Sequence, residues 1–193
     1  LADGTTVLLD ADSALVEELS AEERRVRLLR GAAFFDVEPS TVPFVVEAGS
    51  GETRVLGTEF DVAIDDGDVV VTLSEGSVSV STDADARQAV LEPGQSVSYG
   101  RDGIGPVRTV VVGDTMAWHG GRFVFDNARL GDVVSRLERY RPGRIVILGS
   151  ALARHRVSGS LPLDDSDAAL ASLQSTVGFR MTGLGGRLVV IGP

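Results

Sequence analysis

The sequence predicts two lobes: an all-β lobe of short antiparallel hairpins over residues 1–112, followed by an α/β lobe over residues 113–193. Two observations lead to this fold class. Before Gly113, apolar residues alternate with polar ones in strand-length runs that Gly, Pro or Ser interrupts about every 8 to 12 residues, as in compact all-β domains. After Gly113, apolar residues recur at helical spacing between short strand-like runs, which gives the element order β-α-β β-α-β-β.

In the first lobe, strands are clearest over residues 58–81, where turns at residues 65–68 and at Glu75-Gly76 separate consecutive hairpins. Further short strands are expected at residues 6–9, 26–29, 89–91, 97–99 and 107–112. Residues 13–31 are ambiguous, because one helical face and two strands around an acidic turn both fit the positions of Leu15, Leu19, Val26 and Leu29. A solvated turn is expected for Glu22, Glu23, Arg24 and Arg25.

The second lobe is expected to begin with a strand at residues 123–125 and a helix for which Asp126 or Asn127 is a suitable N-cap. The apolar residues of this helix recur at a spacing that buries one face: Leu130, Val133, Val134, Leu137 and Tyr140. Pro142-Gly143 ends the helix, and a second strand follows at residues 145–148.

The same pattern then repeats. A strand at residues 157–161 precedes a helix that Asp164 or Asp165 caps, that carries Asp167 in its first turn and that Gly178 ends. Strands at 179–182 and 188–191 complete a small sheet of about five short strands, and such a sheet must leave open edges.

Composition narrows the function. The net charge of −10 disfavours nucleic acid and anionic membrane surfaces as partners. The chain has no cysteine, and all 18 basic residues are arginine, which excludes thiolate metal sites, a Schiff base and a phosphate-binding loop that needs lysine. It has no apolar run long enough to span a bilayer. Because it begins with Leu1 and has no signal peptide, we expect a fragment or a processed product.

No catalytic, cofactor-binding or metal-binding residue is predicted. The two histidines, His119 and His155, lie in no recognisable motif, and residues 94–98 lack the last glycine of a nucleophile elbow. The acidic turn at residues 65–68 is too short to supply calcium with its oxygen ligands alone. Trp118 lies at the junction between the lobes, where it is available either to pack against an interface or to contact a partner.

Five sequence segments of the first lobe, in order along the chain, show a family resemblance: LLRGAAFFDV (28–37), PFVVEA (43–48), VLGTEFDV (55–62), LSEGSVSV (73–80) and LEPGQSVSY (91–99). They resemble the periplasmic region of FecR-family transmembrane sigma-factor regulators. The doubled β-α-β unit is similar to the short domain at the N-terminus of secretins and TonB-dependent receptors, which this family also carries at its C-terminal end. The resemblance favours two strands over a helix at residues 13–31.

The resemblance implies a function in signal transduction. The parent protein would be anchored in the inner membrane by a single helix that is absent from this chain, and would contact the sigma factor through an equally absent cytoplasmic part. The periplasmic part would bind the signalling domain of an outer-membrane TonB-dependent receptor, respond to an iron chelate and be processed by periplasmic and intramembrane proteases. The alternative is a periplasmic ligand- or carbohydrate-binding module, which should expose aromatic side chains on one face of the β lobe.

Partner binding is expected at an exposed sheet edge of the second lobe, where a partner strand can be added. We favour the strand at 157–161, because Ser158, Gly159 and Ser160 are small enough for close backbone approach, whereas 188–191 is apolar enough to be a central strand. The candidate partner-binding residues are Arg156, Val157, Ser158, Gly159, Ser160, Leu161 and, at the lobe junction, Trp118.

Overall fold

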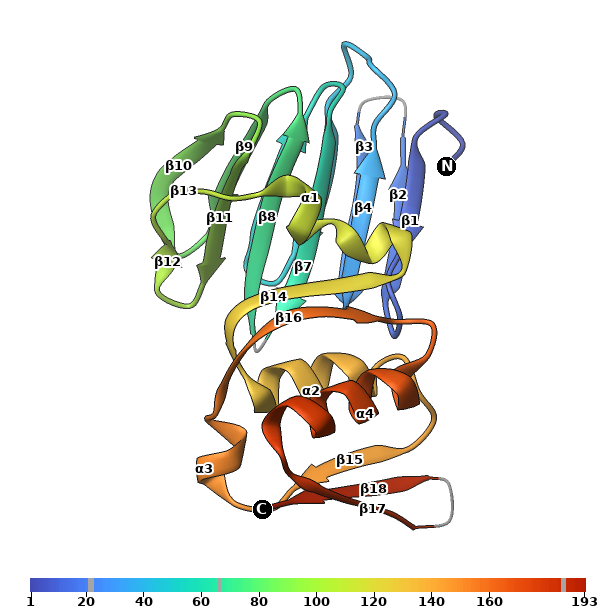
Figure 1. The fold of residues 1–193 in the computed structure, drawn as a ribbon. Helices are drawn as coiled ribbons and strands as arrows, with labels where there is room; N and C mark the ends of the chain where they lie inside the picture. Colours follow the sequence, from blue (N-terminus) through green and yellow to red (C-terminus); the bar gives the residue numbers. More distant parts are fainter. Residues whose placement is uncertain (21–22, 66, 185–186) are drawn as a thin grey trace. The chain divides into compact units, whose positions relative to one another are not determined.

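The computed structural model describes residues 1–20, 23–65, 67–184 and 187–193. The chain divides into two compact parts, Leu1–Met116 (unit 1) and Ala117–Pro193 (unit 2), and each is described by itself (Figure 1). The division falls a few residues beyond the expected boundary at 112/113, because helix α1 (Val112–Thr115) contacts strand β8 of unit 1 (Asp68–Glu75). Within the described residues, no helix is both long and apolar enough to cross a membrane.

Unit 1 is built from two β-sheets. The seven-stranded sheet contains β1 (Thr6–Leu9), β4 (Ala32–Asp36), β7 (Glu59–Asp65), β8, β11 (Gln95–Gly100) and β12 (Gly103–Ile104) in this order, with β13 (Arg108–Thr109) also paired to β11. The six-stranded sheet has the order β10 (Asp85–Leu91), β9 (Val78–Thr82), β6 (Gly51–Val55), β5 (Phe44–Ala48), β3 (Arg24–Arg30) and β2 (Ala14–Leu19). Neighbouring strands pair antiparallel, except that β3 and β5 are parallel.

The core of unit 1 lies between the two sheets, since residues of both contribute to one buried apolar cluster. Phe35 of β4 stacks on Phe60 of β7, with 5.2 Å between the ring centroids, and meets Phe44 of β5 in the other sheet at 5.9 Å. All three phenylalanines are fully buried. Period-two alternation therefore directs one side of each sheet to a shared core, as the sequence predicts.

The structure resolves the ambiguity at residues 13–31 in favour of two strands, because β2 and β3 pair antiparallel. The expectation of a strand over 107–112 is wrong for most of its length. Only Arg108 and Thr109 pair with β11, and Val112 already begins α1. In the turn at 65–68, Asp65 and Asp68 pair to close the β7–β8 hairpin, whereas Asp66 lies outside the described residues.

The expectation of a solvated turn fails at Arg24, which is 6% exposed at the start of β3. Its guanidinium donates to the carboxylate of Asp3 (3.0 Å) and lies over the ring of Phe44, 5.6 Å from the centroid. It also donates to the backbone oxygens of Val42, Glu38 and Leu56 at 3.0, 2.9 and 3.3 Å. Arg24 therefore ties the first residues of the chain to two loops. Glu22 lies outside the described residues.

Unit 2 contains two small sheets and two longer helices. Strand β14 (Arg122–Arg129) pairs antiparallel with β16 (Arg156–Pro162), and the other sheet has the order β15 (Arg144–Ile147), β18 (Leu188–Gly192) and β17 (Arg180–Leu184). The helices α2 (Leu130–Glu138) and α4 (Ser166–Val177) lie between the two sheets (Figure 1). The short elements are the 3₁₀ turn η1 (Ala117–Gly120) and helix α3 (Ser150–Ala153).

The element order β-α-β β-α-β-β is confirmed, and β18 is a central strand as expected. A single five-stranded sheet is wrong, because the strands form separate sheets of two and three. Asp126 and Asn127 do not cap a helix: β14 continues through a bulge between Phe125 and Ala128, and α2 begins at Leu130 without a side-chain cap.

The second helix agrees more closely with its prediction. Asp165 is the N-cap of α4, because its carboxylate accepts from Ala168 N–H at 2.9 Å. Gly178 ends the helix with a left-handed φ of 84°, a conformation that favours glycine. Leu170 and Leu173 are buried, as their spacing predicts.

Candidate interaction surfaces

The β14–β16 ribbon contains most of the predicted partner-binding residues. Two backbone hydrogen bonds show which backbone groups of β16 face β14. Leu163 N–H donates to Gly121 O at one end of the ladder, and Leu130 N–H donates to His155 O at the other, both at 2.8 Å. In an antiparallel ladder, hydrogen-bonded pairs alternate with pairs that are not hydrogen-bonded. The odd-numbered residues of β16 therefore direct their N–H and C=O groups toward β14.

Ser158 and Ser160 consequently direct their backbone groups to the opposite side of β16, which we call the outer edge. In the described part of the chain, no strand pairs with this edge. Gly159 belongs to the other set, since it is paired with Phe125 of β14 and a Cβ at Gly159 would lie 3.5 Å from the Phe125 ring. The small residues at 158 and 160 thus present an open edge, while Gly159 serves the pairing within the ribbon.

The side chains of the predicted residues divide in the same way. Val157 and Leu161 are 9% and 6% exposed and belong to the core of unit 2, so they hold the strand in place and offer little surface. The remaining four predicted residues of the strand are exposed: Arg156, Ser158, Gly159 and Ser160. Trp118 is half-buried and packs against the same core. Its ring is edge-on to that of His119, with 4.4 Å between the ring centroids.

Polar contacts across the ribbon hold the bulge of β14. Ser158 Oγ donates to Asp126 Oδ1 (2.7 Å) and accepts from Asn127 N–H (2.8 Å). Arg156 Nη1 donates to Asn127 O (2.6 Å). Asn127 has a positive φ of 48°, and these contacts support that conformation. The bulge lies on β14, so the outer edge of β16 stays regular.

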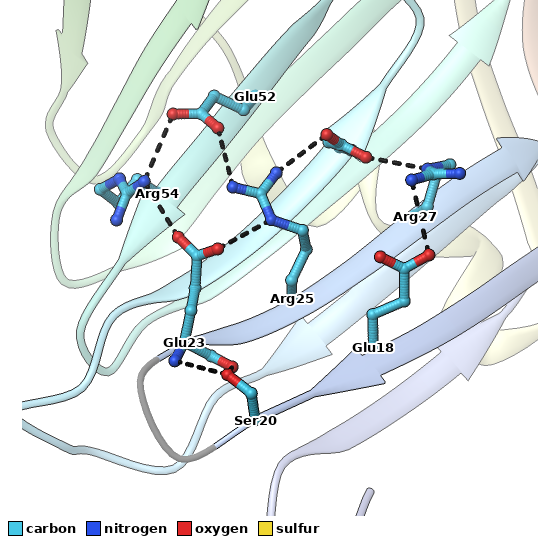
Figure 2. Close-up of polar contacts among 8 residues, drawn as sticks. Glu18, Ser20, Glu23, Arg25, Arg27, Glu52 and Arg54 are labelled. Atoms are coloured by element: carbon cyan, nitrogen blue, oxygen red, sulfur yellow. Dashed lines mark hydrogen bonds and ion pairs between the residues drawn. The ribbon is translucent and has the colours of Figure 1, made fainter.

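A second polar surface lies on the six-stranded sheet of unit 1, where charged side chains from neighbouring strands meet (Figure 2). Arg25 contacts three carboxylates: Glu23 at 2.8 Å, Glu47 at 2.9 Å and Glu52 at 3.4 Å. Arg27 pairs with Glu47 and Glu18, and Arg54 with Glu23 and Glu52. We call these seven charged residues the charge network.

Within the charge network, the ion pair between Glu23 and Arg25 favours the ionised form of both groups. The hydrogen bond from Arg25 is the main reason that the pKa of Glu23 lies below its ordinary value, and burial opposes it only in part. The same hydrogen bond raises the pKa of the Arg25 guanidinium. Every member of the network has a partner of opposite sign. The network links β2, β3, β5 and β6.

A groove of about 770 Å³ adjoins the network at the β5–β6 hairpin, with Arg27, Glu47, Ser50, Glu52 and Asp83 among its lining residues. It has no aromatic lining residue. The aromatic side chains of unit 1 are buried, apart from the half-buried Phe34, so the exposed aromatic face expected of a carbohydrate module is missing from the described residues. Nor do the described residues contain a group of three potential metal ligands.

The described residues form two compact units, and strand β16 of unit 2 has an unpaired outer edge. The family model described as "FecR protein" matches residues 1–79, and the one described as "FecR, C-terminal" matches residues 122–191. Together these matches cover more than half of the sequence, and the chain belongs to the FecR family.

The fold agrees with solved structures of a candidate anti-sigma factor from Parabacteroides distasonis. One crystal structure, at 1.65 Å resolution, has a TM-score of 0.85 and 25% sequence identity over 99% of this chain and 91% of that chain. A second, at 2.50 Å, gives the same TM-score and identity over 100% of this chain and 91% of that chain. No curated protein matches the sequence. Family and fold together make the chain a periplasmic module of a sigma-factor regulator.

Proposed function

We propose that this chain binds the signalling domain of an outer-membrane TonB-dependent receptor through unit 2 and relays the receptor's ligand state to an extracytoplasmic-function sigma factor. The parent protein is anchored in the inner membrane by a single helix outside this chain and contacts the sigma factor through its cytoplasmic part. The signal is receptor occupancy by an iron chelate, and the response is regulated proteolysis by periplasmic and intramembrane proteases. The chain acts by binding, without catalysis, cofactor or metal.

One observation carries the docking proposal: the open outer edge of β16, which lies within the region matched as FecR, C-terminal. An unpaired row of backbone N–H and C=O groups is a template for a partner strand. Ser158 and Ser160 keep this edge free of bulky side chains. The receptor's signalling domain would add a strand beside β16 and extend the two-stranded ribbon.

The test is a pair of substitutions at Ser160. Ser160→Pro removes an outward N–H, and the preceding Gly159 tolerates the restriction that proline imposes on its neighbour. Ser160→Ala removes only the hydroxyl, which accepts from Arg122 Nη2 at 2.8 Å. Binding is measured by calorimetry between the whole chain and the signalling domain of the receptor whose gene neighbours that of the parent protein.

We expect Ser160→Pro to weaken binding at least about tenfold, or about 1.4 kcal/mol, and Ser160→Ala to leave the affinity within about twofold. Circular dichroism and the melting temperature establish that both variants are folded. A folded Ser160→Pro variant with unchanged affinity would eliminate this edge, and the surface around Trp118 would be the next candidate.

A further inference from the structure

The charge of the molecule is divided unequally between its two units. Unit 1 carries 22 of the 28 acidic residues and 8 of the 18 arginines, for a net charge of −14. Unit 2 carries 6 acidic residues and 10 arginines, for a net charge of +4. Although the net charge of the whole chain is −10, unit 2 is basic, and it is unit 2 that contains the open edge of β16. The net charge of unit 2 itself therefore favours an acidic partner at this edge.

Two arginines of the ribbon lie in an arrangement that is unfavourable in isolation. Arg129 of β14 is directly opposite Arg156 of β16, and both side chains are exposed. Because the adjacent pair, Leu130 and His155, is hydrogen-bonded, the arginines occupy a non-hydrogen-bonded pair, in which side chains approach most closely. Like charges directly opposite each other destabilise a strand pair.

The rest of the described chain does not neutralise these arginines. No ion pair joins a carboxylate of the described residues to Arg122, Arg129, Arg154 or Arg156, all four of which are exposed. The nearby carboxylate of Asp126 accepts from Ser158 Oγ instead. The arrangement contrasts with unit 1, where the arginines of the charge network all have acidic partners.

We propose that the outer edge of β16 recognises an acidic, extended segment of its protein partner. The inference rests on the proposed function, because it names the chemistry of the strand that docks there. One carboxylate of the added strand pairs with Arg156 and Arg129, which relieves their mutual repulsion. Backbone hydrogen bonds to Ser158 and Ser160 supply affinity without sequence preference, and the arginines supply the preference for acid.

The ribbon also predicts the spacing of the acidic residues. Side chains at positions 156, 158 and 160 share one face of β16, and the serines between the arginines leave this face open. Arg122 reaches the far end of the face, where it donates to Ser160 Oγ. Positions 156 and 160 are separated by about 13 Å of extended chain, so carboxylates at positions i and i+4 of the partner strand face the two basic ends.

A protein segment fits this surface better than nucleic acid does. Only a few arginines line the ribbon, whereas duplex binding draws its affinity from many phosphate contacts, about 6 to 10 in typical cases. An open backbone edge also gives no advantage to a phosphate chain, because strand addition needs a peptide partner. Anionic vesicles and duplex DNA are therefore included in the test as competing ligands.

The first experiment measures calorimetric binding of the whole chain to the receptor's signalling domain at two salt concentrations. The double variant Arg129→Gln/Arg156→Gln is compared with Arg180→Gln/Arg187→Gln. The second variant removes the same charge at the three-stranded sheet of unit 2, away from the ribbon. We expect the first pair to weaken binding about tenfold and to flatten its salt dependence, and the second to change it less than about threefold. Equal losses would overturn the proposal, since only the overall field would then matter.

The second experiment uses a synthetic β-forming peptide with Glu at positions i and i+4, and the same peptide with Gln. We expect the Glu peptide to bind at least about tenfold more tightly than the Gln peptide, and this difference to disappear in Arg129→Gln/Arg156→Gln. Such a result supports the acidic edge even if the receptor domain does not bind and the proposed function is wrong. Equal binding of the two peptides overturns the acidic edge and leaves receptor docking standing if Ser160→Pro still weakens it. Tighter binding to DNA or anionic vesicles through the same arginines also overturns it.

One stability measurement separates recognition from a structural role. If Arg129 served the fold, Arg129→Gln would lower the melting temperature. Because its charge opposes that of Arg156, we expect the melting temperature of Arg129→Gln to stay equal or rise. A lower value would assign Arg129 to the fold and count against the proposal.

Discussion

The two units differ in what they do with their charges and their strand edges. In unit 1, arginines and glutamates on the six-stranded sheet pair with one another, and a core with four fully buried aromatic side chains lies between the sheets. In unit 2, exposed arginines of the β14–β16 ribbon have no acidic partner within the described chain. The charged side chains of the network in unit 1 are therefore paired within the fold, whereas those of the ribbon in unit 2 stay available for the partner that we propose.

The strand edges of unit 1 are protected in ways that the middle of the outer edge of β16 is not. Strand β12 has two residues and β1 has four, which gives a partner little to pair with. Strand β10 has a bulge between Asp85 and Gln88, and β2 carries Glu17 and Glu18. Short strands, bulges and charges are the usual means of blocking edge pairing. Strand β16 has seven residues, with Arg156 and Pro162 at its ends and Ser, Gly and Ser at its centre, so only the middle of its outer edge is without such a device.

The largest expected effect tests whether the two cores are separate. Phe35→Ala removes the ring that contacts both Phe60 and Phe44, so we expect the free energy of unfolding of unit 1 to fall by about 3–5 kcal/mol. Unit 2 should keep its stability, because its core is a separate cluster. Hydrogen exchange followed by mass spectrometry in increasing denaturant reports both units in one experiment.

Val90→Ala is the control, since Val90 is 61% exposed, and its effect should stay within about 0.5 kcal/mol. If Phe35→Ala accelerated exchange in α2 and α4 as much as in β4 and β7, the units would unfold as one. Residues 117–193 would then not be expected to fold alone.

Local patterns allowed much of this fold to be predicted from sequence. The strands of unit 1 follow from period-two alternation and turn residues, and α4 from its spacing, its cap and Gly178. The error at Asp126 and Asn127 has a long-range cause. These residues look like helix caps, but they form the bulge of β14 and hydrogen-bond to the Ser158 side chain of β16.

The same limit applies to the candidate surfaces. The sequence predicts β16 as a docking strand, and the docking itself stays a proposal. The sequence could not show that Arg129 is opposite Arg156, because this pairing depends on the register of the two strands. Nor could it show that Arg25 meets Glu47 and Glu52, which are more than 20 positions away along the chain. Contacts of this kind are set by sheet topology and leave no local signal.

The next expected effect sharpens the description of unit 2, where sequence alone left Asp164 and Asp165 as alternative caps. Asp165→Ala removes the side chain that accepts from Ala168 N–H, so we expect unit 2 to lose about 1 kcal/mol of stability. Asp164→Ala, at an exposed neighbouring position, should change it by less than about 0.5 kcal/mol. Urea unfolding followed by exchange in α4 measures both. Equal losses would mean that charge near the helix start matters more than the cap.

The smallest expected effect concerns acid, and it tests whether the charge network stabilises unit 1. The pKa of Glu23 in the folded state lies below its ordinary value of 4.5, chiefly because of the hydrogen bond from Arg25. The unfolded state therefore binds more protons in this window, so the contribution of Glu23 is present above about pH 4.5 and is lost as the pH falls through the lowered pKa. Partly exposed ion pairs of this kind contribute about 0–1 kcal/mol.

We accordingly expect unit 1 to lose stability as the pH falls below about 5, and Glu23→Gln to lose less over the same range. Asp3 adds to this dependence: burial alone would raise its pKa, but hydrogen bonds from Thr5 and Arg24 outweigh burial and lower it.

Glu92→Gln, at an exposed position outside the network, should follow the parent chain. Denaturant unfolding at each pH, read by exchange in β3 and β5, gives the slopes. If Glu23→Gln kept the parent's slope, the network would contribute nothing to acid stability, and the difference between the two units would rest on their cores and edges alone.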